Sequence, residues 1–134
     1  MTILTFDNPG TAPAPAGPYS NVARVDLGGA TLLVLAGQIA LDEHGTLVGE
    51  GDVAAQSHRI FATIGALLAA HGAAFGDVVH IRTFLTDLGL LRAYGQVRAT
   101  YLTGPPPAST TVEVSGLFRP GALLEVEVMA ALRP

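Results

Sequence analysis

The sequence of 134 residues contains no cysteine, and this absence removes three kinds of chemistry. Disulfide bonds, thiolate metal sites and thiol nucleophiles all need this residue. The four histidines, His44, His58, His71 and His80, form no H-x-x-x-H pair or similar ligand cluster. Short glycine-rich pieces such as GGA and GEG lack the pattern of a phosphate-binding loop. We therefore expect a protein that uses neither a metal nor a cofactor.

Charge is also scarce. Charged residues make up 13% of the chain, against roughly a quarter in ordinary soluble proteins. The formal net charge is −4, and the seven basic residues are scattered along the sequence. Because nucleic-acid binding needs a basic stripe that displaces counterions, we expect no nucleic-acid partner. A surface so poor in charge indicates that another subunit covers part of it.

Long hydrophobic runs are missing as well. Stretches such as TLLVLAG and IGALLAA are too short to span a bilayer. The first residues, MTILTFDNPG, have neither a basic start nor an apolar run of signal-peptide length. We therefore expect a cytoplasmic protein without a membrane partner. The length fits a single domain over residues 1–134.

Alternating residues and turn signals predict six β-strands. Their predicted ranges are 3–6, 22–27, 31–38, 78–85, 110–114 and 123–130. The pair Gly28-Gly29 predicts a hairpin turn between the second and third strands. In the fourth strand, alternation places Val79 on one face together with residues 81, 83 and 85.

Two further segments have the period of an amphipathic helix. The first begins after Asp52, a good N-cap, and ends before Gly72. The second follows Asp87, has large side chains at 90, 94, 97 and 101, and ends at the prolines 105–107. The order β-β-β-α-β-α-β-β predicts an α+β fold, a two-layer sandwich with both helices on one face of a mixed sheet. An oligomer contact would cover the other face.

Several segments, taken together and in order, resemble the RidA/YjgF family, also called endoribonuclease L-PSP. They are GPYS (17–20), LAGQIALD (35–42), DVAAQ (52–56), GDVVHIRTFLTDL (76–88), VRATY (97–101), PPASTTVEVSGL (106–117) and LLEVEVMA (123–130). Members of this family hydrolyse reactive enamines and imines. The resemblance implies a chorismate-mutase-like fold and a homotrimer with small-molecule pockets between its subunits. It draws attention to residues 107–127 as the main part of such a pocket.

The resemblance also implies roles for individual residues. Glu125 matches the glutamate that positions or activates the attacking water, which makes it the catalytic candidate. Tyr19 matches a tyrosine that closes over the ligand, and the backbone of Ala36 and Gly37 matches the pocket floor. Thr111 stands where many members have a cysteine, so no thiol is available there.

Two positions depart from the family pattern. Active deaminases carry an arginine in P-A-R-S-x-V-E-V, and this chain has Ser109 at that place. Such an arginine grips a substrate carboxylate in a bidentate fork, which serine cannot do. Arg98, conversely, stands where V-N-x-x-Y has asparagine. One hypothesis is that Arg98 reaches the pocket and replaces the missing clamp for a carboxylate-bearing ligand; the alternative is an exposed helix charge.

The residues themselves leave further alternatives open. Glu125 and Glu127 lie on one strand face, which fits a half-buried acid as well as a solvated surface or an ion pair. Tyr19 sits in a loop that could be a mobile lid or an ordinary turn. The hydroxyls at 109–111 could simply reflect β-propensity. Ser109 has no histidine base or nucleophile-elbow pattern beside it, so we do not expect a nucleophile there.

The function predicted from the sequence is hydrolytic deamination of an enamine or imine at pockets between subunits. Ser109 in place of arginine indicates a substrate other than a common 2-imino acid, or altered activity. The alternative is a non-catalytic metabolite-binding or regulatory module. A third hypothesis is ribonuclease activity, against which the acidic net charge of −4 argues.

Overall fold

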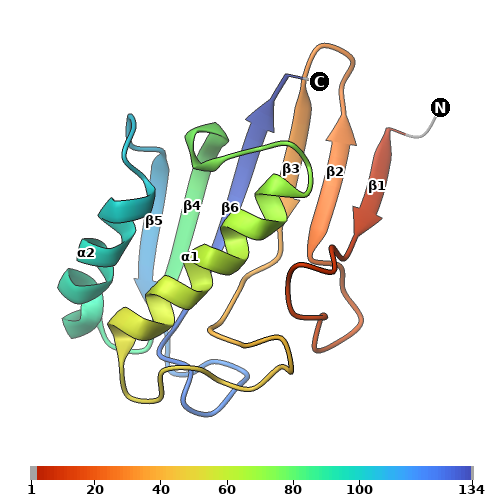
Figure 1. The fold of residues 1–134 in the computed structure, drawn as a ribbon. Helices are drawn as coiled ribbons and strands as arrows, with labels where there is room; N and C mark the ends of the chain where they lie inside the picture. The colour runs from red at the N-terminus through yellow and green to blue at the C-terminus, as the bar shows by residue number, and fades with distance from the viewer. Residues whose placement is uncertain (1–2, 134) are drawn as a thin grey trace.

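Two layers make up the computed structural model, which describes residues 3–133: a six-stranded sheet and two helices on one of its faces (Figure 1). The strands are β1 (Leu4–Asp7), β2 (Val22–Asp26), β3 (Thr31–Leu35), β4 (Val78–Leu85), β5 (Ala108–Glu113) and β6 (Leu124–Leu132). Their order in the sheet is β1-β2-β3-β6-β4-β5. All neighbouring strands are antiparallel except β4 and β5. The predicted α+β sandwich with a mixed sheet is thereby confirmed.

The helices are α1 (Val53–Ala69) and α2 (Leu91–Tyr101), and two 3-10 turns, η1 (Phe75–Asp77) and η2 (Leu88–Leu90), precede β4 and α2. Asp52 caps α1, since its carboxylate accepts the backbone N–H of Ala55 at 3.0 Å. Gly72 follows α1 with a φ of +77°, a conformation that favours glycine. Both helix boundaries agree with the sequence prediction.

The core lies between the helices and the sheet. One face of α1 packs against the inner faces of β3, β4 and β6, and the completely buried side chains include Leu33, Ile60, Phe61, Ile64, Leu67, Leu68, Ile81, Leu85, Leu124 and Val126. The second helix is tied to this core through Tyr94, whose hydroxyl lies 2.6 Å from the Thr83 hydroxyl in a buried hydrogen bond. Within residues 3–133, neither helix is long and apolar enough to cross a membrane.

The predicted face of β4 is wrong at one position. Val79 is 45% exposed, whereas Val78 is buried on the same side as Ile81. A bulge between Val78 and His80 in the pairing with β6 is the reason. A bulge inserts one extra residue into a strand and so shifts the alternation of its side chains.

Strand β3 is shorter than predicted, and this affects the site. It ends at Leu35, where the neighbouring Ala36 N–H donates to the carbonyl of Asn21 at 2.9 Å. Beyond this point the chain no longer pairs with β2. It rejoins the sheet at Gln38, which forms an isolated antiparallel bridge with Val126 of β6. The Gly28-Gly29 turn, by contrast, is a hairpin between β2 and β3, as predicted.

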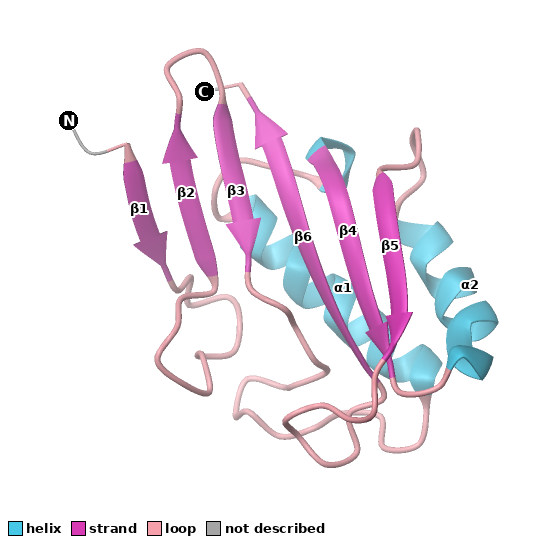
Figure 2. Cartoon of the chain, turned by 180° about the vertical axis from the view of Figure 1, so that it is seen from behind, coloured by secondary structure: helices cyan, strands magenta, loops and turns pink. Residues whose placement is uncertain are grey.

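Within residues 3–133, no layer of secondary structure covers the sheet face away from the helices (Figure 2). We call it the open face. Apolar side chains such as Val34, 37% exposed, and Val112, 40% exposed, lie on it. Near them an ion pair joins Arg82 Nε and Glu127 Oε1 at 2.6 Å. Glu125 belongs to the same face, because side chains on a strand alternate and its neighbours Leu124 and Val126 are buried.

Candidate active site

Four of the residues singled out in the sequence meet in one pocket at the end of the open face. Tyr19, Ala36, Gly37 and Glu125 line a hollow of about 380 Å³. The remaining wall comes from residues 16–18 and from Phe118. The pocket therefore lies where the loop before β2, the segment after β3 and the beginning of β6 come together.

Buried polar side chains hold two of these walls together. Gln38 Nε2 donates to Asn21 Oδ1 at 3.2 Å and to the carbonyl of Ala36 at 3.1 Å. Asn21 Nδ2 in turn donates to the carbonyl of Pro13 at 3.0 Å. Because both amides are buried, these bonds fix the loop that carries Tyr19 against the segment that carries Gly37. The sequence analysis missed Asn21 and Gln38; their polarity at the ends of apolar runs was the available signal.

Gly37 and Glu125 lie so close together that a larger residue at 37 would displace the Glu125 carboxylate. A Cβ atom added to Gly37 would lie 2.5 Å from Glu125 Oε2 and 2.8 Å from Cδ. The amides flanking Gly37 are used, since Ala36 N–H donates to Asn21 and Gln38 N–H donates to Val126. The Gly37 N–H has no acceptor among the described residues. It is thus a free donor beside the Glu125 carboxylate.

The Glu125 carboxyl is poorly solvated. Burial raises its pKa above the ordinary value, and the negative charge of Glu127 raises it further. Among residues 3–133, no side chain or amide donates a hydrogen bond to it and no cation pairs with it. Glu127 differs, because its Oε1 pairs with Arg82 Nε at 2.6 Å, and this ion pair gives it a structural role.

Two aromatic side chains border the pocket. The Tyr19 hydroxyl accepts the N–H of Ala16 at 3.2 Å, and the Tyr19 N–H donates to the carbonyl of Gly17 at 2.8 Å. The loop is thus a tight turn, with the tyrosine ring 45% exposed. Phe118 is 60% exposed and lines the same pocket. The sequence analysis missed Phe118, although an aromatic residue in the loop G-L-F-R-P-G is an unusual feature.

The other three predicted site residues lie elsewhere. Ser109 is level with Ile81 and Thr111 is level with Thr83, so both face the helix side of the edge strand β5. Arg98 on α2 reaches Ser109 there, and its Nη1 donates to Ser109 Oγ at 3.1 Å. Within one chain, residues 107–127 thus contribute to two separate groups and do not form a single pocket.

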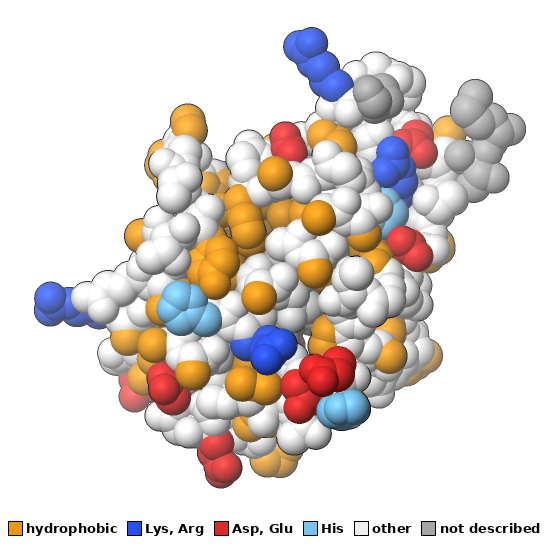
Figure 3. Space-filling model, in the orientation of Figure 1, with side chains coloured by type: hydrophobic (Ala, Val, Ile, Leu, Met, Phe, Trp, Pro, Cys, Tyr) orange, Lys and Arg blue, Asp and Glu red, His pale blue; other side chains and the backbone are white. Residues whose placement is uncertain are grey.

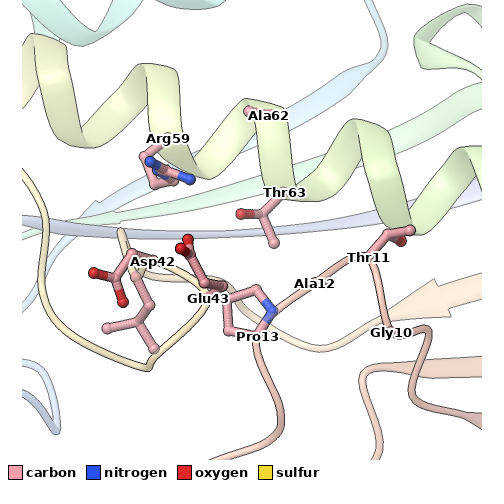
Figure 4. Close-up of a pocket in the computed structure, with 10 residues that line it drawn as sticks. Gly10, Thr11, Ala12, Pro13, Asp42, Glu43, Arg59, Ala62 and Thr63 are labelled. Atoms are coloured by element: carbon pink, nitrogen blue, oxygen red, sulfur yellow. The ribbon is translucent and has the colours of Figure 1, made fainter.

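A further hollow contains none of the predicted site residues (Figure 4). In it, Arg59 and Thr63 of α1 face Asp42, Glu43 and Pro13. The backbone N–H groups of Thr46 and His44 both donate to Asp42 Oδ1 at 2.9 Å and lower the pKa of that carboxyl. These bonds shape the turn at residues 42–46, so we assign Asp42 a structural role. No cluster of three metal-ligating side chains occurs in residues 3–133.

Comparison with known proteins identifies the family. Residues 9–132 match the family described as Endoribonuclease L-PSP. Protein DfrA of Myxococcus xanthus is 44% identical over 119 residues, which is 89% of this chain and 88% of that protein. The 3-aminoacrylate deaminase RutC of Acinetobacter baylyi is 34% identical over 122 residues (91% and 93%). The mouse 2-iminobutanoate/2-iminopropanoate deaminase is 30% identical over 123 residues (92% and 87%).

Solved structures give the same result. The yeast protein YEO7 superposes with a TM-score of 0.88 and 31% identity, covering 97% of this chain and 99% of that one. The protein YyfA of the conserved Rid family from Yersinia pestis superposes with a TM-score of 0.86 and 31% identity, covering 96% and 99%. With the match over residues 9–132, these similarities show that the chain belongs to the Rid family, the endoribonuclease L-PSP family.

Proposed function

We propose that this protein hydrolyses a reactive enamine or imine to a carbonyl compound and ammonia, with Glu125 as the catalytic residue. The observation that carries the proposal is the half-buried Glu125 carboxyl, which accepts no hydrogen bond and pairs with no cation among the described residues. A desolvated acid next to a free backbone donor, the Gly37 N–H, is suited to proton transfer at a small polar substrate.

The proposed step begins with a water molecule held by the ionised Glu125. The water oxygen bonds to the C=N carbon while one of its protons passes to the carboxylate, and the C=N electron pair moves to nitrogen. Glu125 then returns the proton to that nitrogen, which gives a carbinolamine. In the same way it takes the hydroxyl proton of the carbinolamine and passes it to nitrogen, so the C–N bond breaks and ammonia leaves as the carbonyl forms. The Gly37 N–H is placed to stabilise charge on the reacting group. An enamine enters the same path after a proton adds to its carbon.

The relatives support this class of reaction. One is named a 3-aminoacrylate deaminase, whose substrate is an enamine, and another is named a 2-iminobutanoate/2-iminopropanoate deaminase, whose substrates are imines. Both match about nine tenths of this chain. Enamines and imines interconvert by a proton shift, so one pocket with a single acid can serve either.

We further propose that the complete site forms between copies of the chain in a homotrimer. The pocket group (Tyr19, Ala36, Gly37, Glu125) and the edge group (Arg98, Ser109, Thr111) cannot surround one ligand within a chain. A ring of head-to-tail contacts would bring the edge group of one copy to the pocket of the next and close without free ends. Such contacts would also cover the apolar side chains of the open face.

A non-catalytic binding module is the second candidate. It is favoured by Ser109, which leaves strand β5 without the cation of the deaminase pattern. Ribonuclease activity, the third, has less support. The net charge is −4, and on the helix-bearing face the charged side chains are scattered with no continuous basic stripe (Figure 3). Loss of RNA cleavage on further purification would exclude it.

A coupled assay tests the proposal. An amino-acid oxidase generates 2-imino acids in situ, and ammonia release is followed with and without the protein. We expect faster release with the wild-type chain and no acceleration with Glu125→Gln. An absence of acceleration across several imino acids and 3-aminoacrylate, together with tight binding of a product such as 2-oxobutanoate, would favour the binding module.

A further inference from the structure

We propose that Arg98 is the residue that binds the substrate's carboxylate, reaching the ligand from helix α2 beside Ser109. This inference rests on the proposed function and adds a specificity-determining residue, the one that recognises a carboxylate on the substrate. It begins from the contact between Arg98 Nη1 and Ser109 Oγ at 3.1 Å.

The Arg98 guanidinium is an unneutralised cation. Arg24 and Arg82 have carboxylate partners, at 3.1 Å and 2.6 Å, but among residues 3–133 no carboxylate lies within 4 Å of Arg98. Its one hydrogen bond goes to a neutral hydroxyl. A guanidinium has five N–H donors in a planar fork, so most of them stay free for a second, charged acceptor.

No acidic residue lies among the described residues that line the groove around Arg98. Arg98 lines an open groove of about 350 Å³ between α2 and residues 102–107, and the other residues of that groove are apolar or small. Glu113 is the acidic residue of β5, and its Oε1 accepts the Leu88 N–H at 2.8 Å instead. An external carboxylate would therefore meet the guanidinium without displacing an internal ion pair.

The Ser109 hydroxyl adds a second donor beside the Arg98 guanidinium. Ser109 and Thr111 are two residues apart on β5 and face the same side of the strand. Ser109 is exposed and Thr111 is partly exposed. The Arg98 guanidinium beside the Ser109 hydroxyl offers charge and several donors to one carboxylate, which is the chemistry of bidentate carboxylate recognition. In the proposed assembly this group faces the pocket of the next copy.

Arg98 has a competing role, because it lies in the last turn of α2, where a cation interacts favourably with the helix dipole. That role depends on charge alone, whereas the fork geometry matters for a carboxylate. Arg98→Lys separates the two, since it keeps the charge and loses the fork. Arg92 supplies a matched control on the same helix, exposed and without a carboxylate partner among the described residues.

The test measures binding of two probes, 2-oxobutanoate and its neutral amide, to the intact protein. We expect Arg98→Ala to raise the Kd for 2-oxobutanoate tenfold or more, Arg98→Lys to raise it by a smaller factor, and Arg92→Ala to leave it unchanged. Binding of the amide should change less than twofold in every variant. The Arg98 Nε–Hε resonance, assigned by its loss in Arg98→Lys, should shift when 2-oxobutanoate is added. A further variant, R98N/S109R, should restore affinity.

Equal binding by Arg98→Ala and Arg92→Ala would overturn the inference, as would equal losses for the two probes or no binding of 2-oxobutanoate by the wild type. Should Arg98→Ala fail to fold, Arg98→Lys and the side-chain resonance decide. The outcome is separable from that of the deaminase assay. Binding that depends on Arg98, without turnover, would support this inference and contradict the proposed reaction. Turnover with binding that does not depend on Arg98 would support the reaction and contradict this inference.

Discussion

Glu125 and Ser109 face opposite sides of one sheet, although strand β4 alone separates their strands. Glu125 is level with Phe84 and Ser109 is level with Ile81, three residues apart on β4. Side chains alternate along a strand, so an odd separation puts the two on different faces. One chain therefore cannot bring both to a single ligand, and the proposed site needs a second copy.

Replacing Glu125 by glutamine should reduce the kcat/KM of deamination by on the order of 100-fold or more, because an amide cannot accept the proton of the attacking water. The ammonia-release assay measures this. Glu50→Gln serves as the control, since Glu50 is exposed and lies outside the pocket. Retention of more than half of the wild-type rate in Glu125→Gln would contradict the proposed role.

The same substitution should stabilise the fold at neutral pH. Burial raises the pKa of Glu125 in the folded state, so the folded protein binds its proton more tightly than the unfolded chain does. The stabilisation from this proton is complete below the ordinary glutamate pKa of about 4.3 and is lost as pH rises through the raised value. Glutamine keeps the site neutral throughout.

Thermal unfolding at a fixed protein concentration measures the effect. Glu125→Gln should have a higher Tm than the wild type at pH 7.5, and the difference should shrink as pH falls toward 4. A Tm difference that grows on acidification would show that the Glu125 carboxylate is stabilised in the fold, against the burial described here.

Glu127 should tune the pH dependence of the reaction. Its charge raises the pKa of Glu125, and its removal also frees the Arg82 cation on the same face. Both changes favour ionised Glu125, so Glu127→Gln should move the acid limb of the kcat/KM profile to lower pH. A pH–rate profile for wild type, Glu127→Gln and Glu50→Gln checks this. If the acid limb of the profile stayed at the same pH in Glu127→Gln, a group other than Glu125 would control it.

Gly37 should be essential for activity and dispensable for folding. A Cβ at this position would lie 2.5 Å from Glu125 Oε2, and the flexible carboxylate can move away. We expect Gly37→Ala to lower kcat/KM by roughly tenfold or more, because a carboxylate displaced by about 1 Å loses its alignment with the substrate. Gly29→Ala is the control, since no atom lies within 4 Å of its added Cβ. Equal activities of Gly37→Ala and Gly29→Ala would show that catalysis does not depend on the close approach of Gly37 and Glu125.

The position of α2, and with it Arg98, should depend on Tyr94. Tyr94→Phe leaves the buried Thr83 hydroxyl without the partner that lies at 2.6 Å. We expect a loss of roughly 1–3 kcal/mol in the free energy of unfolding, measured by urea denaturation. Tyr101→Phe removes a solvent-exposed hydrogen bond to His58 and should cost less than about 0.5 kcal/mol. Similar values for both variants would mean that the buried bond contributes little.

Local patterns predicted much of this fold. The period of α1 and α2, their end signals and the Gly28-Gly29 hairpin each follow from neighbouring residues. The side of Val79 does not, because a bulge depends on how β4 pairs with β6. The end of β3 at Leu35 does not follow from neighbouring residues either. It depends on the hydrogen bond from the Ala36 N–H to the carbonyl of Asn21, the residue before β2.

The candidate site was also only partly predictable, because local patterns indicate residues but not the contacts between distant segments. A pattern resemblance singled out Glu125 and Gly37, but their contact joins segments far apart in the sequence. The paired departures at 98 and 109 were visible in the sequence, and the register of β5 was needed to show on which face they meet. Phe118 belongs to no periodic pattern, so only the folded loop places it at the pocket.

Subunit complementation tests the two-copy site most directly. Glu125→Gln inactivates the pocket group, and Ser109→Trp blocks the edge group with a bulky side chain on an exposed strand. Each variant alone should be inactive. When both variants are co-expressed in equal amounts, about a quarter of the sites in the proposed homotrimer should receive each intact group from the appropriate copy and regain activity. Activity near a quarter of the wild-type level is the predicted result; a mixture no more active than its parents would contradict a site shared between copies.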